Sequence, residues 1–183
     1  MTEQISEIIV SRALSVIEKM ASMMCSKPDE LRMSAQTGST KCEINFHCAD
    51  TVDSKRLVGQ GGARLKSFQA LLAMMLRDTG IEAIIGRVEK DRECPTPFTK
   101  FESKPDWNKE EIVALFVEAL SACFPEQEVG HRVVDTSSTG TWFYGQFELQ
   151  NNETSHFTNL AGDVFGAIGI NHGRRIIVDR ELK

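Results

Sequence analysis

The sequence lacks the features that mark a membrane protein, a zinc protein or a familiar class of enzyme. In its 183 residues no apolar run approaches the roughly 20 residues of a membrane span, and Glu3 and Glu7 stand where a signal peptide is basic. Its five cysteines form no Cys-x-x-Cys pair, and no Gly-x-Ser-x-Gly, His-Glu-x-x-His or acid-rich metal cluster occurs. We therefore expect a cytoplasmic protein with reduced thiols, no cofactor, no metal and no catalytic activity.

Isolated groups of reactive residues have simpler explanations than catalysis. His47 and Cys48 are adjacent on a predicted strand, so their side chains point to opposite faces of the sheet. The carboxylate pairs Asp29-Glu30 and Glu110-Glu111 lie at a turn and at a helix start, where capping accounts for them. We interpret none of these groups as an active site.

The net charge of −5 is unevenly distributed along the chain. Residues 1–90 hold 12 Lys and Arg against 11 Asp and Glu, whereas residues 91–183 hold 9 against 15. Within residues 51–77 the only acidic residue is Asp53, and the basic ones are Lys55, Arg56, Arg64, Lys66 and Arg77. Because local potential and not net charge steers a polyanion, this segment is the candidate for contact with nucleic acid.

The basic segment surrounds a glycine turn, Gly59-Gln60-Gly61-Gly62. A helical pattern follows at once, with apolar residues at the spacing of one helix face: Leu65, Phe68, Leu71, Leu72, Met75 and Leu76. A glycine turn that opens a helix presents backbone N–H groups, and the helix dipole favours an anion there. The arrangement predicts a phosphate-binding turn.

Two familiar phosphate-binding motifs do not fit this turn. A nucleotide-binding P-loop needs a second glycine before Lys66-Ser67, and Leu65 occupies that position. A dinucleotide fingerprint needs a third glycine where Arg64 stands. What remains is a Gly-x-x-Gly turn between two short helices, the kind of loop with which KH modules clamp about four backbone nucleotides of a single strand.

The pattern of the first half predicts the order helix, strand, strand, helix, glycine turn, helix, strand. Amphipathic spacing predicts the helices, alternating apolar residues predict the strands, and Gly80 ends the long helix. The predicted elements are a helix over 4–25, strands over 30–34 and 41–48, a short helix over 54–58, a long helix to about 78 and a strand over 81–89.

This order resembles the type II (prokaryotic) KH domain, in particular small bacterial single-KH RNA-binding proteins and the KH half of Jag-type proteins. The matching residues are Pro28-Asp29-Glu30-Leu31, Leu57-Val58-Gly59-Gln60-Gly61-Gly62 and Leu71-Leu72, and the resemblance covers about residues 4–90. It implies binding of single-stranded nucleic acid. The family usually has a lysine after the first glycine, and Gln60 stands there in this chain. A glutamine supplies no charge, so we expect lower affinity and weaker salt dependence.

Three of the five prolines fall in residues 91–108, which we interpret as a linker between a KH domain over 1–90 and a second domain over 109–183. Its aromatic residues Phe98, Phe101 and Trp107 are expected to pack against a neighbouring domain. The second half repeats the first in outline, with helix, strand, strand, helix and strand. We therefore predict an α+β protein of two tandem KH-like units, each a three-stranded sheet packed with helices.

The second unit is predicted to lack the clamp. Aligning the last helix and strand of the two halves places Phe157 on Leu65 and Ile177 on Ile85. Between the second strand and the long helix, the first half has sixteen residues, 49–64, and the second only seven, 150–156. The short helix and glycine turn are missing, so we interpret this acidic half as a degenerate unit that acts as scaffold, protein-binding surface or homodimer contact.

We expect the protein to bind single-stranded RNA, or single-stranded DNA, in post-transcriptional regulation or RNA chaperoning. The alternative is a protein-interaction or structural protein on a KH-like scaffold that has lost nucleic-acid binding. In the first case a second contact would come from Arg174 and Arg175. The main contacts would come from the turn and its flanks: Lys55, Arg56, Leu57, Val58, Gly59, Gln60, Gly61, Gly62, Arg64 and Lys66.

Overall fold

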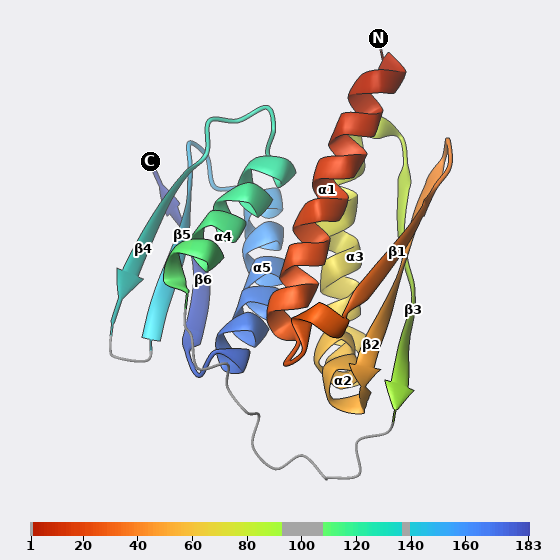
Figure 1. The fold of residues 1–183 in the computed structure, drawn as a ribbon. Coiled ribbons are helices and arrows are strands. Elements are labelled where there is room, and N and C mark those ends of the chain that lie inside the picture. Colours follow the sequence, from red (N-terminus) through yellow and green to blue (C-terminus); the bar gives the residue numbers. More distant parts are fainter. Residues whose placement is uncertain (1, 93–107, 137–139) are drawn as a thin grey trace. The chain divides into compact units, whose positions relative to one another are not determined.

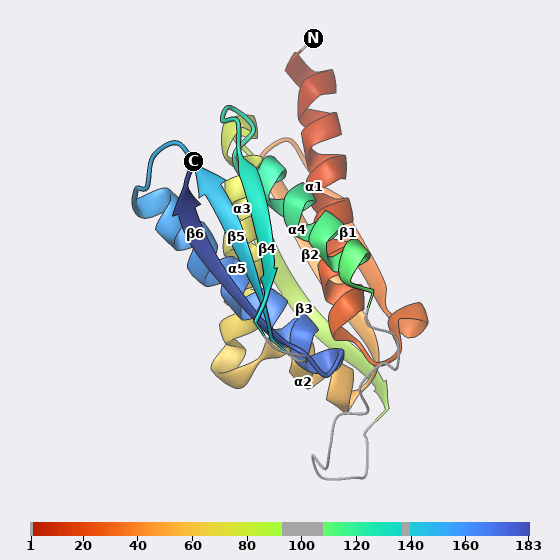
Figure 2. The same ribbon diagram turned by 90° about the vertical axis from the view of Figure 1, so that its left-hand side faces the viewer.

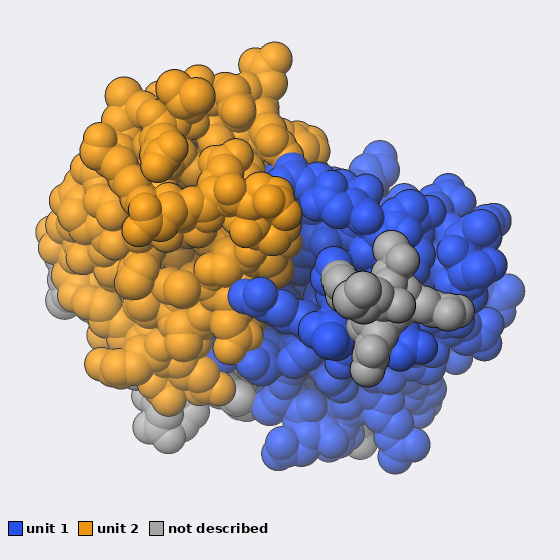
Figure 3. Space-filling model, turned by 90° about the horizontal axis from the view of Figure 1, so that it is seen from above, with its two compact units in different colours: residues 1–102 blue, residues 103–183 orange. Residues whose placement is uncertain are grey.

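The computed structural model describes residues 2–92, 108–136 and 140–183. The chain divides into two compact units, residues 1–102 and 103–183 (Figure 3). Each unit consists of one three-stranded sheet with helices packed on one of its faces (Figure 1). The predicted α+β class and the two-sheet architecture are confirmed.

Unit 1 follows the predicted order of elements. Asp50 ends the second strand and begins the short helix, while Gly80, in the left-handed conformation, follows the last turn of the long helix. The elements are α1 (Thr2–Met24), β1 (Arg32–Thr37), β2 (Lys41–Asp50), α2 (Thr51–Val58), α3 (Ala63–Leu76) and β3 (Glu82–Arg92), with 3-10 turns at Pro28–Glu30, Gln60–Gly62 and Arg77–Thr79.

The sheet of unit 1 has the order β1-β2-β3, with β1 and β2 antiparallel and β2 and β3 parallel. Ile44 of β2 pairs with Ala35 on one side and Ile85 on the other. Alternate β2 side chains are buried beneath the helices: Cys42, Ile44, Phe46 and Cys48. Burial of this face against the apolar sides of α1 and α3 supplies the main stabilisation of the unit.

Unit 2 repeats this topology without an equivalent of α2. Its sheet has the order β4-β5-β6, antiparallel and then parallel, and its helices cover one face (Figure 2). Phe116 of the first helix is the centre of an aromatic core, with its ring centroid 5.3 Å from that of Phe143 and 5.4 Å from that of Phe165. The elements are α4 (Lys109–Cys123), β4 (Gly130–Asp135), β5 (Gly140–Phe147), α5 (Asn152–Asn171) and β6 (Arg175–Leu182).

Two predicted boundaries are wrong by a few residues. The first strand begins at Arg32 and not at residue 30, because Pro28–Glu30 forms a 3-10 turn. Residues 91 and 92 of the predicted linker belong to β3. The prediction that Asn108 caps the following helix is confirmed, since its side chain accepts from the Glu111 N–H. The rest of that linker, with Phe98, Phe101 and Trp107, lies outside the described residues.

The alignment of the two halves is one residue out. Ile85 pairs with buried Ile44 and so lies on the covered face of its sheet, whereas Ile177 pairs with Trp142 on the opposite face of its own sheet. A shift of one residue along a strand moves every side chain to the other face. The counterpart of Ile85 is therefore Val178, which pairs with buried Phe143.

None of the helices over residues 2–92, 108–136 and 140–183 is long and apolar enough to cross a membrane.

Candidate nucleic-acid interface

The glycine turn is a true break between α2 and α3. Gly59 ends α2 with φ 71° and ψ 178°, and its N–H donates to the Lys55 carbonyl at 2.9 Å. Gly61 and Gly62 also have positive φ, 59° and 80°. Residues with side chains rarely adopt these angles, so the glycines, and not the surrounding packing alone, set the direction of the chain.

The tip of the turn is open and its base is closed. A Cβ added to Gly59 would lie 2.9 Å from the Arg64 Cβ and 3.0 Å from the Arg64 nitrogen, whereas one added to Gly61 or Gly62 would meet nothing within 4 Å. Gln60 and Gly61 are exposed. A ligand can therefore approach the main chain at the tip while the base stays fixed.

Two of the turn's four N–H groups, those of Gly59 and Gly62, donate within the protein. Gly62 donates to the Gly59 carbonyl at 3.3 Å, and Ala63 donates to that of Gln60. The first N–H groups of any helical turn precede its first internal hydrogen bond. Within the described part of the chain no side chain caps the start of α3. The turn thus presents backbone donors at the positive end of a helix dipole.

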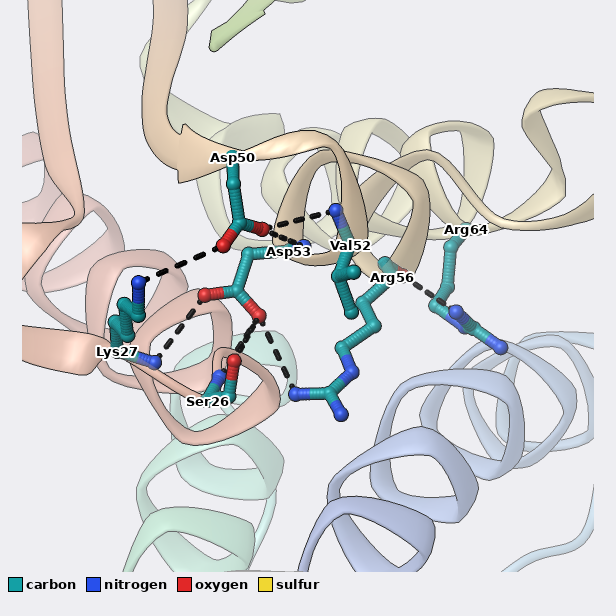
Figure 4. A network of polar contacts seen from close by, with 7 residues as sticks. All are labelled: Ser26, Lys27, Asp50, Val52, Asp53, Arg56 and Arg64. Carbon is teal, nitrogen blue, oxygen red and sulfur yellow. Dashed lines mark hydrogen bonds and ion pairs between the residues drawn. The ribbon is translucent and has the colours of Figure 1, made fainter. Parts of the chain in front are cut away.

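A polar joint fixes α2, and with it the turn, to the end of α1 (Figure 4). The Asp50 carboxylate caps α2 by accepting hydrogen bonds from the N–H groups of Val52, at 2.9 Å, and Asp53, at 3.2 Å. It also forms an ion pair with the Lys27 ammonium at 3.6 Å. Capping of this kind determines where the helix begins and stabilises it by about 1 kcal/mol.

Asp53 is the buried centre of that joint. Its side chain is 1% exposed, and it accepts from the Ser26 N–H at 2.8 Å, the Ser26 hydroxyl at 2.9 Å and the Lys27 N–H at 3.2 Å. It also accepts from the Arg56 guanidinium at 3.2 Å. A buried carboxylate is tolerated only with such partners, so this one joins two helices tightly.

The four cations predicted around the turn therefore differ in their surroundings. Lys55 and Lys66 are exposed. Arg56 is 6% exposed and directed inward to Asp53, and its burial lowers the pKa of the guanidinium, an effect that the carboxylate partly opposes. Arg64 donates to the Arg56 carbonyl at the end of α2 (Figure 4). Two lysines face solvent, and two arginines brace the turn.

The predicted apolar contacts also divide. Leu57 is fully buried in the core of unit 1, whereas Val58 and Leu65 are half-buried on either side of the turn.

Beneath the same joint lie the buried thiols of Cys25 and Cys48. The hydrogen bond to Cys48, and then burial, raise the pKa of the Cys25 thiol.

The two arginines predicted as a second contact lie in unit 2. Arg175 begins β6 and is exposed. Arg174 is half-buried, and its charge helps to lower the pKa of Asp135, after the larger effects of hydrogen bonds from Lys109 and Thr141. The two arginines and the glycine turn thus belong to different units.

The joint is the part of the site that reasoning from the sequence missed. From the sequence, the polar stretch Asp50-Thr51-Val52-Asp53 is predicted to cap the short helix, and Ser26 has no predicted role. The pattern Ser-Lys-Pro-Asp at the end of a helix, followed by a second acidic cap, was the available signal. It does not specify which backbone groups a carboxylate meets 26 or 27 residues away.

Comparison with protein-family models gives no match to this chain, and comparison with the curated proteins gives none either.

Proposed function

We propose that the protein binds single-stranded RNA, or single-stranded DNA, through the glycine turn of a type II KH-like domain in unit 1. The observation that supports this most strongly is the uncapped and exposed start of α3, entered through three glycines with positive φ. Gly61 and Gly62 carry no side chain that could come between their main chain and a phosphate.

In this mechanism consecutive phosphates of one strand lie over Gln60 and Gly61. Backbone N–H groups of the turn donate to the phosphate oxygens, and Lys55 and Lys66 supply charge from either side. Arg56 and Arg64 do not contact the phosphates in this mechanism but position the backbone of the turn. Arg56 donates to Asp53, and Arg64 donates to the Arg56 carbonyl, so together they hold the end of α2 in place. Sequence preference is weak, since phosphate contacts position a strand without reading its bases.

The test is the double variant Gln60→Asp, Gly61→Asp. Two carboxylates at the exposed tip repel the phosphates. The fold is retained because the tip has no packing to lose and the positive φ of residue 61 costs only about 1 kcal/mol. We expect loss of at least about 1.4 kcal/mol, or tenfold, in affinity for a labelled single strand measured by fluorescence polarisation. Binding equal to that of the parent would show the clamp assignment to be wrong.

A matched control places the same two charges on another exposed turn of unit 1. Gly38 and Ser39 join β1 to β2 and are exposed, and a Cβ at Gly38 would approach only the Lys41 carbonyl at 3.9 Å. The variant Gly38→Asp, Ser39→Asp changes net charge equally, so it should retain binding. If it lost as much affinity as the turn variant, general repulsion and not a clamp would account for both.

A second test restores the lysine that KH turns usually carry. Gln60→Lys adds one exposed cation beside the backbone donors. We expect tighter binding and a steeper dependence on salt, by about 0.7 in the slope of log affinity against log salt for one more phosphate contact. An unchanged slope would show that position 60 lies off the strand.

The competing function is protein interaction on the same scaffold, with nucleic-acid binding lost. One observation favours it: only two of the four cations around the turn face solvent. The ratio of absorbance at 260 and 280 nm, for protein purified at low and at high salt, discriminates between the two. Nucleic acid retained at low salt supports strand binding. Its absence, with no polarisation change and a stable complex with another protein, supports the competing function.

A further inference from the structure

The face of the unit 2 sheet that α4 and α5 leave uncovered carries two aromatic rings in line. Trp142 and Tyr144 alternate along β5 with the buried Thr141, Phe143 and Gly145 and are themselves half-buried. Their ring centroids lie 5.8 Å apart and the rings are nearly parallel, at 13°. A stack of this kind can serve only to stabilise the sheet. Whether it can also bind a ligand depends on which groups lie at its two ends.

The end of the stack at Tyr144 is closed by the protein's own groups. The guanidinium carbon of Arg132 lies 4.5 Å from the Tyr144 ring centroid, and Arg132 donates to the two carboxylate oxygens of Glu181 at 2.6 and 2.9 Å. Gln146 donates to Glu181 as well, at 3.2 Å. Glu181 pairs with Gln146, two residues beyond Tyr144, so this cluster leaves no place for a ligand there.

The end of the stack at Trp142 is different. The next position of β5 on the same face is Gly140, which has no side chain. Two residues along a strand span about 6.6 Å, so no side chain of β5 keeps a planar ring from lying against the indole. Val134 of β4 and Ile177 of β6 pair with Trp142 and flank the indole with apolar side chains.

The charged residues on this face of β6 differ between the two ends of the stack. The residues that face outward are Arg175, Ile177, Asp179 and Glu181, which pair with Gly140, Trp142, Tyr144 and Gln146 in turn. The exposed cation thus lies beside Gly140, and both carboxylates lie toward the closed end. A ligand with a flat ring and an adjacent negative charge fits with its ring on Trp142 and its anion at Arg175. A nucleotide has this combination.

We propose that Trp142, Gly140 and Arg175 form a second nucleotide-binding subsite. A base of the single strand stacks on the indole, and its phosphate pairs with Arg175. The inference rests on the proposed function for the class of ligand, but it assigns unit 2 a binding role of its own, in place of the scaffold role expected from its acidic composition.

The first test compares Trp142→Leu with Trp142→Phe in the full chain. The probe is a labelled polyuridine strand of about ten nucleotides, within the range of single-strand site sizes. Leucine keeps an apolar side chain but removes the ring, so we expect affinity to fall about tenfold, whereas phenylalanine keeps most of it. Equal affinity for parent and Trp142→Leu, with both melting normally, overturns the subsite.

The second test reads the indole directly. The chain has two tryptophans, so Trp107→Phe leaves Trp142 as the only one. Stacking of a base should quench its fluorescence, and the quenching should saturate at the strand concentration that saturates polarisation. Arg175→Glu should weaken the quenching, and Arg175→Lys should retain it. An emission that stays constant while polarisation saturates overturns the inference.

The two proposals fail separately. If Gln60→Asp, Gly61→Asp loses affinity and Trp142→Leu does not, the turn binds the strand and the subsite is wrong. If Trp142→Leu loses affinity and the turn variant does not, the subsite is upheld and the glycine clamp is wrong. A parent protein that binds no strand in polarisation and shows no quenching overturns both.

Discussion

The two units build the same three-stranded sheet but enter their long helix in opposite ways. In unit 1, α2 and the glycine turn separate the end of β2 from α3, and no side chain in the described part of the chain caps α3. In unit 2, α5 begins at residue 152, five residues after β5 ends at residue 147. Asn151 accepts from the Thr154 N–H at 2.9 Å and donates to the Thr154 hydroxyl at 3.0 Å.

This difference shows how one framework supports two uses of a helix start. The capping box of α5 gives the N–H groups of Asn151 and Thr154 partners within the protein, which stabilises the helix. The start of α3 has no such side-chain cap in the described part of the chain, and the glycine turn depends on the polar joint with α1 to hold its position. Four predictions test this contrast, and each substitution changes a structural feature that is described in only one of the two units.

The largest effect should come from removing the centre of the joint. Asp53→Ala leaves the Arg56 charge buried without its carboxylate and removes the acceptor for Ser26 and Lys27. We expect the free energy of unfolding to fall by about 3–5 kcal/mol in urea denaturation. Adding Arg56→Met to this variant should recover part of the loss. A fall below about 1 kcal/mol would show that the joint is not what holds α2.

The next effect separates the base of the glycine turn from its tip. Gly59→Ala places a methyl group against Arg64 at a backbone angle that only glycine readily adopts, so we expect a loss of about 2–3 kcal/mol. Gly61→Ala meets no neighbour and should cost about 1 kcal/mol, the penalty for positive φ alone. Thermal melts of the two variants make the comparison, and equal losses would contradict it.

A smaller effect tests the cap that is found only in unit 2. Asn151→Ala removes the side-chain oxygen that accepts from the Thr154 N–H, while the backbone N–H of residue 151 can still donate to the Thr154 hydroxyl. We expect a loss of about 1 kcal/mol in unfolding free energy. Asn151→Ser can still accept from the same N–H and should lose less. Strand binding through the glycine turn should not change in either variant.

The smallest effect concerns pH. Hydrogen bonds from Arg132 and Gln146 lower the pKa of Glu181 from its usual 4.5, so the carboxylate stabilises the folded protein above that value. This contribution is lost as pH falls from about 5 through the lowered pKa. Glu181→Gln should therefore show a slightly weaker decrease in melting temperature over that range than the parent does. Identical profiles would indicate that the pair is fully screened.

Most of the fold could be predicted from the sequence because local signals agree with one another. Gly80, Asn108 and the alternation of β2 each specify a boundary or a face by local chemistry. The alignment of the two halves failed by one residue because helical and strand faces depend on partners across the sheet. Ile85 and Ile177 are the same type of residue and nevertheless face opposite ways.

The candidate site could be predicted only in part. Three glycines in four residues identify the turn, because the requirement for positive φ is local. The inward direction of Arg56 depends on where α1 ends relative to α2, a tertiary arrangement that no nearby residue specifies. The stack of Trp142 and Tyr144 was missed for a related reason: spacing of two along a strand does not show which face the helices cover.

The thiols of Cys25 and Cys48 provide a built-in reporter of the joint. Both are buried, and a cysteine held in its protonated form reacts with alkylating reagents only after it reaches solvent. The rate of Cys25 alkylation, followed by mass spectrometry, therefore reports how often the end of α1 separates from α2. A nucleic-acid strand bound at the glycine turn would lower the rate of Cys25 alkylation without contacting either sulfur.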